Sequence, residues 1–270
     1  MLTNGNIQEI PAELYHYTNL ESLALILKNK TIRFSPLSTL DDPQEQETSD
    51  IPNFGQYFYA SCWTDSNVES IPMWNMYASL ESGVRIALPY FPFKRWGTER
   101  LNISRAHCIT NQPNGELSVR ELKPGIEIQS LGLISAFRVI YTDNAEQLKP
   151  PITDQATGRF FINKTSMGRY KNKYWEFQTE WRYLIDATDW CRYSTERPGL
   201  EFIERRRAML NGDKTTAPNY IDLPLNATLF KEMTVTLSPK MSAGNQLLAE
   251  ALFNKYGVTH IVPSELQGLL

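Results

Sequence analysis

The segment from Leu14 to Ser35 constrains the fold of this chain more than any other. It begins with the run Leu-Tyr-His-Tyr-Thr and ends with the β-branched and aromatic run Thr31–Phe34, and both runs are typical of strands. Between them, Thr18 followed three residues later by Glu21 has the form of a capping box, which indicates the start of a helix. The helix has apolar residues at helical spacing, namely Leu20, Leu23, Ala24 and Leu27. The sequence therefore predicts a strand, a helix and a second strand.

His16 is the candidate binding residue of this segment. The pattern places it at the end of the first strand, just before the helix begins, where a rigid scaffold commonly presents a ligand-binding group. Its ring nitrogen can donate a hydrogen bond to a ligand hydroxyl, while Tyr17 offers an aromatic face. A packed, hydrogen-bonded structural histidine explains the same residues equally well, so both interpretations stay open.

Composition and charge limit the class of protein. The formal net charge of -3 gives no basic field for nucleic acid or an anionic membrane. Three cysteines and three histidines, widely spaced, predict neither a disulfide framework nor a metal site. The first residues lack the form of a secretory signal, and no run of about 18 apolar residues could span a bilayer. We expect a soluble, cytoplasmic protein with no membrane partner.

The order of the predicted elements indicates the fold class. Strands and helices are mixed irregularly and no repeat is visible, which predicts a single α+β domain over residues 1–270, with a mixed, mostly antiparallel sheet and surrounding helices. Further strands are expected at 56–63, 83–88, 101–110, 116–122, 134–141, 181–185, 220–224, 233–237 and 258–262. Further helices are expected at 73–78, 143–148, 167–174, 198–210, 226–230 and 243–256, the last with an apolar stripe of Leu247, Leu248, Ala251 and Leu252.

Two more groups of residues could form a site. Trp74 and Tyr77 share one face of a predicted helix, either as an aromatic core stripe or as a face for a ligand ring. Glu180 opens a strand next to aromatic residues, where a carboxylate could stabilise a developing cation or activate a hydroxyl. The alternative is a structural ion pair of Glu180 with Arg182 or Lys173.

Basic residues are the weakest of the candidate groups. Lys171, Lys173 and the run 205–207 are better explained as solvated faces than as phosphate contacts. The glycine-rich phosphate loops, the zinc-protease motif and the serine-hydrolase motif are absent from the sequence.

Several short motifs follow one another along the chain: Leu-Tyr-His-Tyr-Thr-Asn-Leu-Glu-Ser-Leu (14–23), Ile-Arg-Phe-Ser (32–35), Leu-Asp-Asp-Pro-Gln-Glu (40–45), Ser-Cys-Trp-Thr (61–64), Met-Trp-Asn-Met-Tyr-Ala (73–78), Gly-Val-Arg-Ile (83–86) and Glu-Trp-Arg (180–182). Their order resembles the bacterial and phage family called domain of unknown function 2971. The resemblance runs from residue 14 to about 262, and the core of the domain is expected at about 12–262. Asp41 departs from the asparagine expected before Asp-Pro, a mild change in a turn.

The chain is also remotely similar to ADP-ribosyltransferases of the histidine–tyrosine–glutamate type. This resemblance implies an ADP-ribosyltransferase-like fold and NAD as co-substrate, with no metal. His16 would bond the adenosine ribose, Tyr77 or Tyr17 would stack on nicotinamide, and Glu180 would stabilise the oxocarbenium-like transition state. The implied catalytic residues are thus Glu180 and His16, and the implied NAD-binding residues are Tyr17, Thr18, Trp74, Tyr77 and Arg182.

Three classes of function follow from these residues. The first is an NAD-dependent ADP-ribosyltransferase or NAD glycohydrolase acting in conflict between bacteria and phage, with a protein or nucleic acid as acceptor. The second is a non-catalytic module that binds a nucleotide, another small molecule or a protein in the same cleft. The third is a protein that acts on nucleic acid through its local basic residues.

Overall fold

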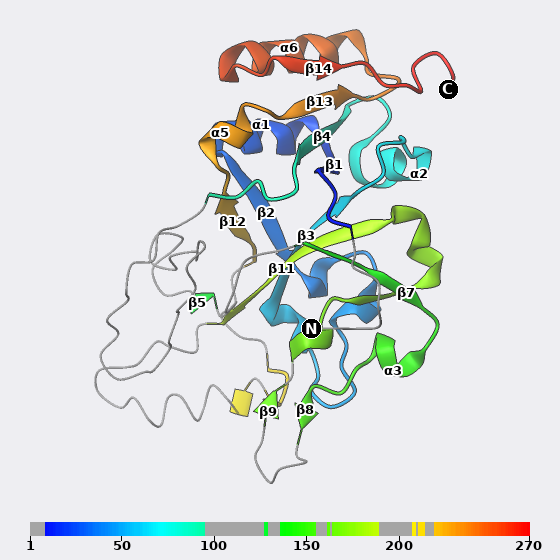
Figure 1. Cartoon of the computed structure of the whole chain (residues 1–270), viewed down its shortest axis with the longest axis vertical. Helices are drawn as coiled ribbons and strands as arrows, with labels where there is room; N and C mark the ends of the chain where they lie inside the picture. The colour runs from blue at the N-terminus through cyan, green and yellow to red at the C-terminus, as the bar shows by residue number, and fades with distance from the viewer. Residues whose placement is uncertain are drawn as a thin grey trace, which may run out of the picture. The chain divides into compact units, whose positions relative to one another are not determined.

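The chain groups into two compact units that are each built from distant segments. The structure, a computed structural model, describes residues 9–94, 127–128, 136–154, 161–162, 164–188, 207–208, 210–213 and 219–270 (Figure 1). Unit 1 comprises Met1–Lys30, Trp63–Pro92 and Leu225–Leu270, and unit 2 comprises Thr31–Cys62 and Phe93–Pro224. The expectation of one domain stays a prediction.

Antiparallel pairing dominates among the described strands. Among the described strand pairs whose register is known, β13 with β14 and β10 with β7 are parallel and the others are antiparallel. The fold is therefore mixed, with a mostly antiparallel sheet and helices, as predicted. Within the described residues, no helix combines the length and apolar character needed to cross a membrane.

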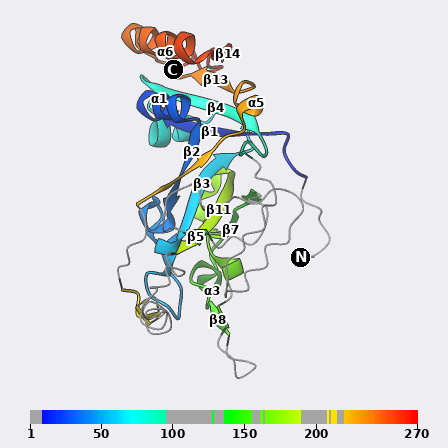
Figure 2. The same ribbon diagram turned by 90° about the vertical axis from the view of Figure 1, so that its left-hand side faces the viewer.

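Unit 1 has four strands that hydrogen-bond in the order β1-β4-β13-β14. They are β1 (Glu13–Asn19), β4 (Gly83–Pro89), β13 (Thr234–Leu237) and β14 (His260–Val262). Its helices are α1 (Leu20–Asn29), α2 (Ile71–Met73), the π-helix η4 (Trp74–Ala78), α5 (Ala227–Phe230) and α6 (Ala243–Tyr256). Helix α1 contacts β1, β4 and α6, and the rotated view shows the two helices on the same side of these strands (Figure 2).

The predicted strand–helix–strand segment is present, but β1 is longer than expected. Asn19, not Thr18, caps α1, because its side chain accepts a hydrogen bond from the backbone N–H of Ser22. The strand continues to Asn19, so His16 lies in the middle of β1, opposite Ile86 of β4, and not at a strand end. Local capping signals locate a helix start only to within a residue or two, because neighbouring Thr and Asn can both serve.

The two faces of β1 carry different side chains. Successive residues of a strand point to opposite faces of its sheet. His16 contacts Trp63, whereas Tyr17 contacts Trp74. Arg85 is opposite Tyr17 in the register with β4 and therefore shares the Tyr17 face. His16 and Tyr17 thus face opposite sides of the sheet.

Helix α6 begins and ends as predicted but buries a different face. Ser242 caps its first turn, and Gly257 ends it in the left-handed region with φ of 71°. The residues it buries are Ala249 and Phe253, while Leu247 and Leu248 of the predicted stripe are 67% and 61% exposed. That part of the prediction is wrong, because tertiary contacts select which side of a helix with several apolar residues is covered.

Unit 2 is centred on a pairing of four longer strands. β12 (Ile221–Pro224) pairs with β2 (Thr31–Pro36), β2 pairs with β3 (Phe58–Thr64), and β11 (Glu180–Thr188) pairs with β3 and with the short strands β5 (Glu127–Ile128) and β6 (Phe137–Arg138). The small sheets are β10 (Tyr170–Asn172) with β7 (Ile140–Thr142), and β8 (Thr153–Asp154) with β9 (Phe161–Ile162). The helical turns are η1 (Leu37–Thr39), η2 (Pro43–Gln46), η3 (Phe54–Tyr57), α3 (Ala145–Leu148), η6 (Lys164–Ser166) and η7 (Lys173–Gln178). The last two residues of β3, Trp63 and Thr64, belong to unit 1.

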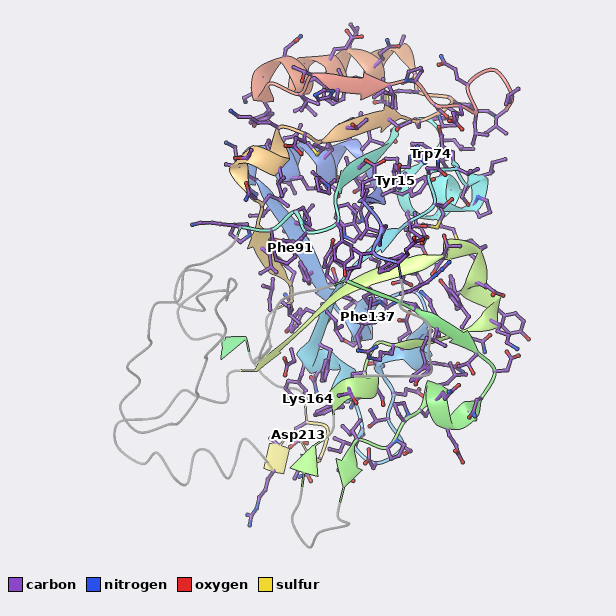
Figure 3. The ribbon with its side chains drawn as sticks, viewed as in Figure 1. Tyr15, Trp74, Phe91, Phe137, Lys164 and Asp213 are labelled. Atoms are coloured by element: carbon purple, nitrogen blue, oxygen red, sulfur yellow. The ribbon has the colours of Figure 1, made fainter. Side chains whose placement is uncertain are left out.

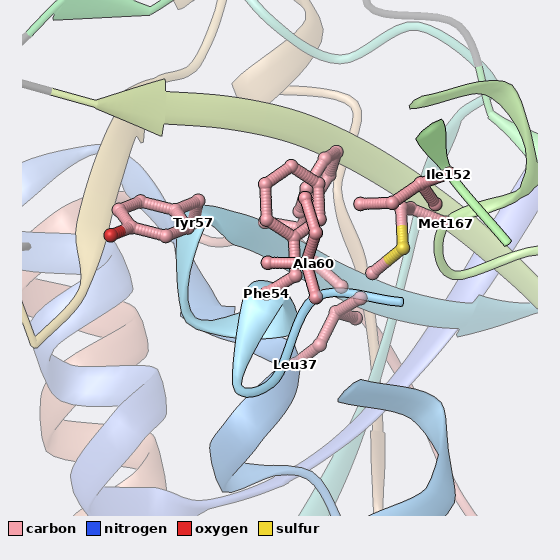
Figure 4. Packing of buried hydrophobic residues seen from close by; sticks show 8 residues of the cluster. Leu37, Phe54, Tyr57, Ala60, Ile152 and Met167 are labelled. Carbon is pink, nitrogen blue, oxygen red and sulfur yellow. The ribbon is translucent and has the colours of Figure 1, made fainter. Parts of the chain in front are cut away.

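A hydrophobic cluster fills the interior of unit 2 between segments far apart in sequence (Figure 4). It comprises Leu37, Ile51, Phe54, Tyr57, Phe58, Ala60, Ile152 and Met167. All eight side chains are nearly excluded from solvent, and each large apolar side chain buried in this way contributes about 1.5–3 kcal/mol. The cluster therefore joins the 37–60 region to Ile152 and Met167, which lie far later in the chain.

Two predicted elements of unit 2 differ from the structure. The helix expected at 167–174 is absent: Gly168 has φ of 65°, which interrupts a right-handed helix, and the chain continues as β10 and η7. The strand expected at 134–141 is broken at Val139 into β6 and β7. The strands expected at 101–110 and 116–122 and most of the helix expected at 198–210 lie outside the described residues.

We predict that Gly83→Ala destabilises the protein. A Cβ at this position would lie 2.4 Å from the carbonyl oxygen of Ser79 and 2.6 Å from the Cβ of Ala78, so the backbone would have to move. We expect the free energy of unfolding to fall by about 1–3 kcal/mol, as measured by urea denaturation. Gly244→Ala is the matched control, because a Cβ there meets no atom within 4 Å and alanine favours the helix. Equal stability of the two variants would contradict this account.

Candidate functional site

The candidate residues are distributed over both units. His16, Tyr17, Thr18, Trp74 and Tyr77 belong to unit 1. The other two, Glu180 and Arg182, belong to unit 2. We therefore describe the surroundings of each group separately.

His16 lies beside an indole ring. Its imidazole centroid is 5.1 Å from the ring centroid of Trp63, with 38° between the ring planes, and Trp63 is 2% exposed. The histidine itself is half-buried. Thr18, on the same face of β1, is buried. This arrangement fixes the ring plane of His16 while part of its side chain stays in contact with solvent.

Tyr17 and Trp74 form part of the core of unit 1. Their rings meet edge to face at 5.0 Å and 87°, and both side chains are buried. The Tyr17 hydroxyl accepts a hydrogen bond from the backbone N–H of Ser70, which caps α2. Tyr77 is half-buried and packs against this cluster, which also contains Met73 and Ala78. These contacts directly support the aromatic-core interpretation of Trp74, which Figure 3 labels.

Glu69 is a buried residue that the sequence interpretation missed. Its carboxylate accepts hydrogen bonds from Trp74 Nε1 at 2.8 Å, Ser264 Oγ at 2.6 Å and the Glu265 backbone N–H at 2.7 Å. These bonds attach the segment after β14 to the π-helix. Nothing local in the sequence marks a lone glutamate before a helix cap as a buried acceptor.

Glu180 and Arg182 form a buried ion cluster with two further residues, Glu45 and Lys171. Glu180 Oε1 accepts from Arg182 Nη2 at 2.6 Å and from Nε at 2.8 Å, and Glu180 Oε2 accepts from Lys171 Nζ at 3.1 Å. Lys171 Nζ lies 3.0 Å from Glu45 Oε1, and Arg182 Nη1 is paired closely with Glu45 Oε2. All four side chains are at most 5% exposed.

The cluster carries two positive and two negative groups and is neutral overall. Burial alone would raise the pKa of the Glu180 carboxyl, but the charges of Arg182 and Lys171 outweigh it and lower this pKa to about 2. Burial lowers the pKa of Lys171, and the two carboxylates outweigh that effect and raise it. Cys62 is affected as well, because burial and then the charge of Glu180 raise the pKa of its thiol.

The sequence predicts half of this cluster. Arg182 is one of the two alternative ion-pair partners predicted for Glu180, and the structure has that pair. The other predicted partner, Lys173, is exposed and pairs with Asp143 at 2.7 Å. The true partner, Lys171, is buried and not on a solvated face, because β10 directs it inward. The sequence feature that could have pointed to Glu45 is the Leu-Asp-Asp-Pro-Gln-Glu motif, in which Asp42 caps η2, the turn that carries Glu45.

Arg85 is a second residue to which the sequence analysis gave no role. Its guanidinium carbon lies 4.7 Å from the ring centroid of Tyr15 and 5.9 Å from that of Tyr17. Nη1 donates to the backbone oxygen of Asn67 at 2.9 Å, and the side chain is 7% exposed. Figure 3 labels Tyr15, which is half-buried.

Comparisons with known proteins add no relative. A scan of protein-family models, a search of curated proteins and a search of solved structures each find no match. The resemblances described above therefore stay predictions. Within the residues that the structure describes, no three His, Cys, Asp or Glu side chains are grouped as metal ligands.

We predict that Glu180→Gln strongly destabilises unit 2. The change removes a buried negative charge and leaves Lys171 and Arg182 with one carboxylate between them. Breaking a buried ion pair on one side costs about 3–5 kcal/mol, so the urea midpoint should fall markedly. Glu176→Gln, in an exposed carboxylate of the neighbouring turn η7, is the matched control and should change stability little. Equal urea midpoints for the two variants would argue against a stabilising cluster.

The lowered pKa of Glu180 also predicts a pH dependence. A carboxyl whose pKa is lower in the folded than in the unfolded chain stabilises the fold at high pH and loses that effect on protonation. The contribution should be complete above pH 4.5, the ordinary value, and should disappear as pH falls toward 2. The difference in Tm between wild type and Glu180→Gln should therefore shrink over this range. A difference that stays constant would contradict the assignment.

Proposed function

We propose that this chain is a binding module for a nucleotide-like small molecule, with NAD as the first candidate. The observation that carries the proposal is the half-buried imidazole of His16 held against the buried indole of Trp63. A ring nitrogen in a fixed plane suits a directed hydrogen bond to a ribose hydroxyl, because little side-chain freedom is lost on binding. The surrounding strands β1 and β4 supply the rigid support that such a contact needs.

The state of Glu180 favours binding without turnover. A catalytic carboxylate must reach the sugar carbon on which positive charge develops. Glu180 is 3% exposed, and its two oxygens are engaged by Arg182 and Lys171. In this proposal the glutamate stabilises unit 2 and takes no part in chemistry.

An NAD-dependent ADP-ribosyltransferase or NAD glycohydrolase is the second candidate. The observation in its favour is the carboxylate of Glu180 at the first position of β11, paired with Arg182 and Lys171, because a fixed negative group is what an oxocarbenium-like sugar requires. In that case His16 bonds the adenosine ribose, whereas Tyr77 packs with Tyr17 and Trp74, which lie on the opposite face of the sheet, and does not stack on the same ligand. The acceptor would be water, a small molecule, a protein or nucleic acid.

A role in nucleic-acid binding receives less support from the described residues. Lys171 is buried in the ion cluster, and Lys173 is paired with Asp143. Neither is available as a phosphate contact without breaking an ion pair.

We predict that NAD binds the purified protein without release of nicotinamide. Calorimetric titration should show binding, and His16→Ala should weaken it about tenfold, the effect of one good hydrogen bond. His260→Ala, an exposed histidine of β14, is the matched control and should leave the Kd unchanged. His16→Phe keeps the contact with Trp63 and separates the role of the ring nitrogen from that of packing.

The same samples distinguish the two candidates. Free nicotinamide is assayed by chromatography, at a temperature where circular dichroism shows each variant folded. Nicotinamide release that is lost in Glu180→Gln would establish the transferase class and exclude a purely binding module. Absence of NAD binding to the folded wild-type protein would exclude both.

A further inference from the structure

Arg85 is a buried cation without a carboxylate partner. Within the described residues, no Asp or Glu oxygen lies within ion-pair distance of its guanidinium, which is 7% exposed. Among the groups that the structure describes, Nη1 has one acceptor, the backbone oxygen of Asn67, and Nε is buried without one. This leaves the Nε edge of the guanidinium, which commonly pairs with an anion in a bidentate manner, without an acceptor.

The nearby groups do not neutralise this charge. The rings of Tyr15 and Tyr17 offset part of the cost of burial by cation–π contact. The Tyr15 hydroxyl donates to the carboxylate of Glu13. Burial and that hydrogen bond raise the pKa of Tyr15 to about 12, so its phenol is neutral at physiological pH. A buried charge that stays unpaired costs several kcal/mol.

Arg33 in unit 2 shows how an arginine beside a tyrosine ring is usually paired with a carboxylate. Its guanidinium carbon lies 3.5 Å from the ring centroid of Tyr220, and it also donates to Asp222, with Nε 2.9 Å from Oδ1 and Nη2 3.2 Å from Oδ2. Each of the two arginines contacts an aromatic ring. They differ in the bidentate carboxylate, which Arg33 has and Arg85 lacks.

We propose that Arg85, between Tyr15 and Tyr17, binds a phosphate group of a small-molecule ligand. The planar guanidinium matches the oxygens of a phosphate, which would supply the missing negative charge. The half-buried ring of Tyr15 provides a flat apolar surface next to that position. This site is distinct from His16, because Arg85 and Tyr17 share the opposite face of the sheet.

The stability of the protein without ligand gives one test, because replacing a purely structural arginine would lower the Tm. If Arg85 is retained for binding, its replacement by an apolar side chain of similar length removes an uncompensated charge. We expect the Tm of Arg85→Met without ligand to equal or exceed that of wild type. Arg33→Met, which breaks the pair with Asp222, is the matched control and should not raise the Tm.

Binding gives the second test. At constant ionic strength, pyrophosphate or ADP should raise the Tm of the wild-type protein and of Arg33→Met, and Arg85→Met should abolish the rise. Arg85→Lys keeps the charge but loses the bidentate geometry, so the Kd for the same probe should increase roughly tenfold. This variant keeps the test decisive even if Arg85→Met does not fold. A response to ADP but not to pyrophosphate would identify a nucleotide as the source of the phosphate.

Two outcomes would overturn the proposal. One is a wild-type protein whose Tm responds to neither pyrophosphate nor ADP. The other is equal stabilisation of Arg85→Lys, Arg85→Met and wild type by the probe. His16→Ala separates this inference from the proposed function. Pyrophosphate binding that survives His16→Ala but not Arg85→Met supports the Arg85 site whether or not NAD binds.

Discussion

The mutual neutralisation of four buried charges is the interaction on which unit 2 depends. Glu45, Lys171, Glu180 and Arg182 come from η2, β10 and β11, and none of them could be buried alone without a large desolvation cost. Arg182 also donates to the backbone oxygen of Gly168, so the loop before β10 is attached as well. The ion cluster therefore specifies how these three segments pack together, and the apolar cluster of unit 2 does so as well.

Among the described residues of unit 1, Glu69 and Arg85 are buried charged side chains whose hydrogen bonding differs. Glu69 has three hydrogen-bond donors around its carboxylate, and its burial is compatible with a purely structural role. Arg85 has one acceptor and two aromatic rings. The carboxylate of Glu69 thus has its hydrogen bonds within the fold, whereas Nε of the Arg85 guanidinium lacks an acceptor among the described residues. This difference points to Arg85 as the place where a ligand contributes.

Local sequence signals predicted most of the secondary structure. Asn, Ser and Gly residues at helix ends were informative because each satisfies backbone groups within a few residues: Ser242 and Gly257 bound α6, and Asn226 caps α5. The predicted element boundaries were wrong where the local sequence allows more than one conformation. Thr18 and Asn19 compete for the same cap, and Gly168 interrupts the helix expected at 167–174.

The sequence by itself determined the strand–helix–strand start and the capped helices, because these depend on residues close in the chain. The order of the elements predicted the mostly antiparallel fold class, and Arg182 was one of two partners predicted for an ion pair with Glu180. Tertiary structure alone decided that Glu45 and Lys171 complete that pair, that α6 buries Ala249 and Phe253, and that Arg85 lies between two tyrosines. The reason is physical: burial and charge pairing depend on which distant segments pack together, and neither periodicity nor capping encodes that choice locally.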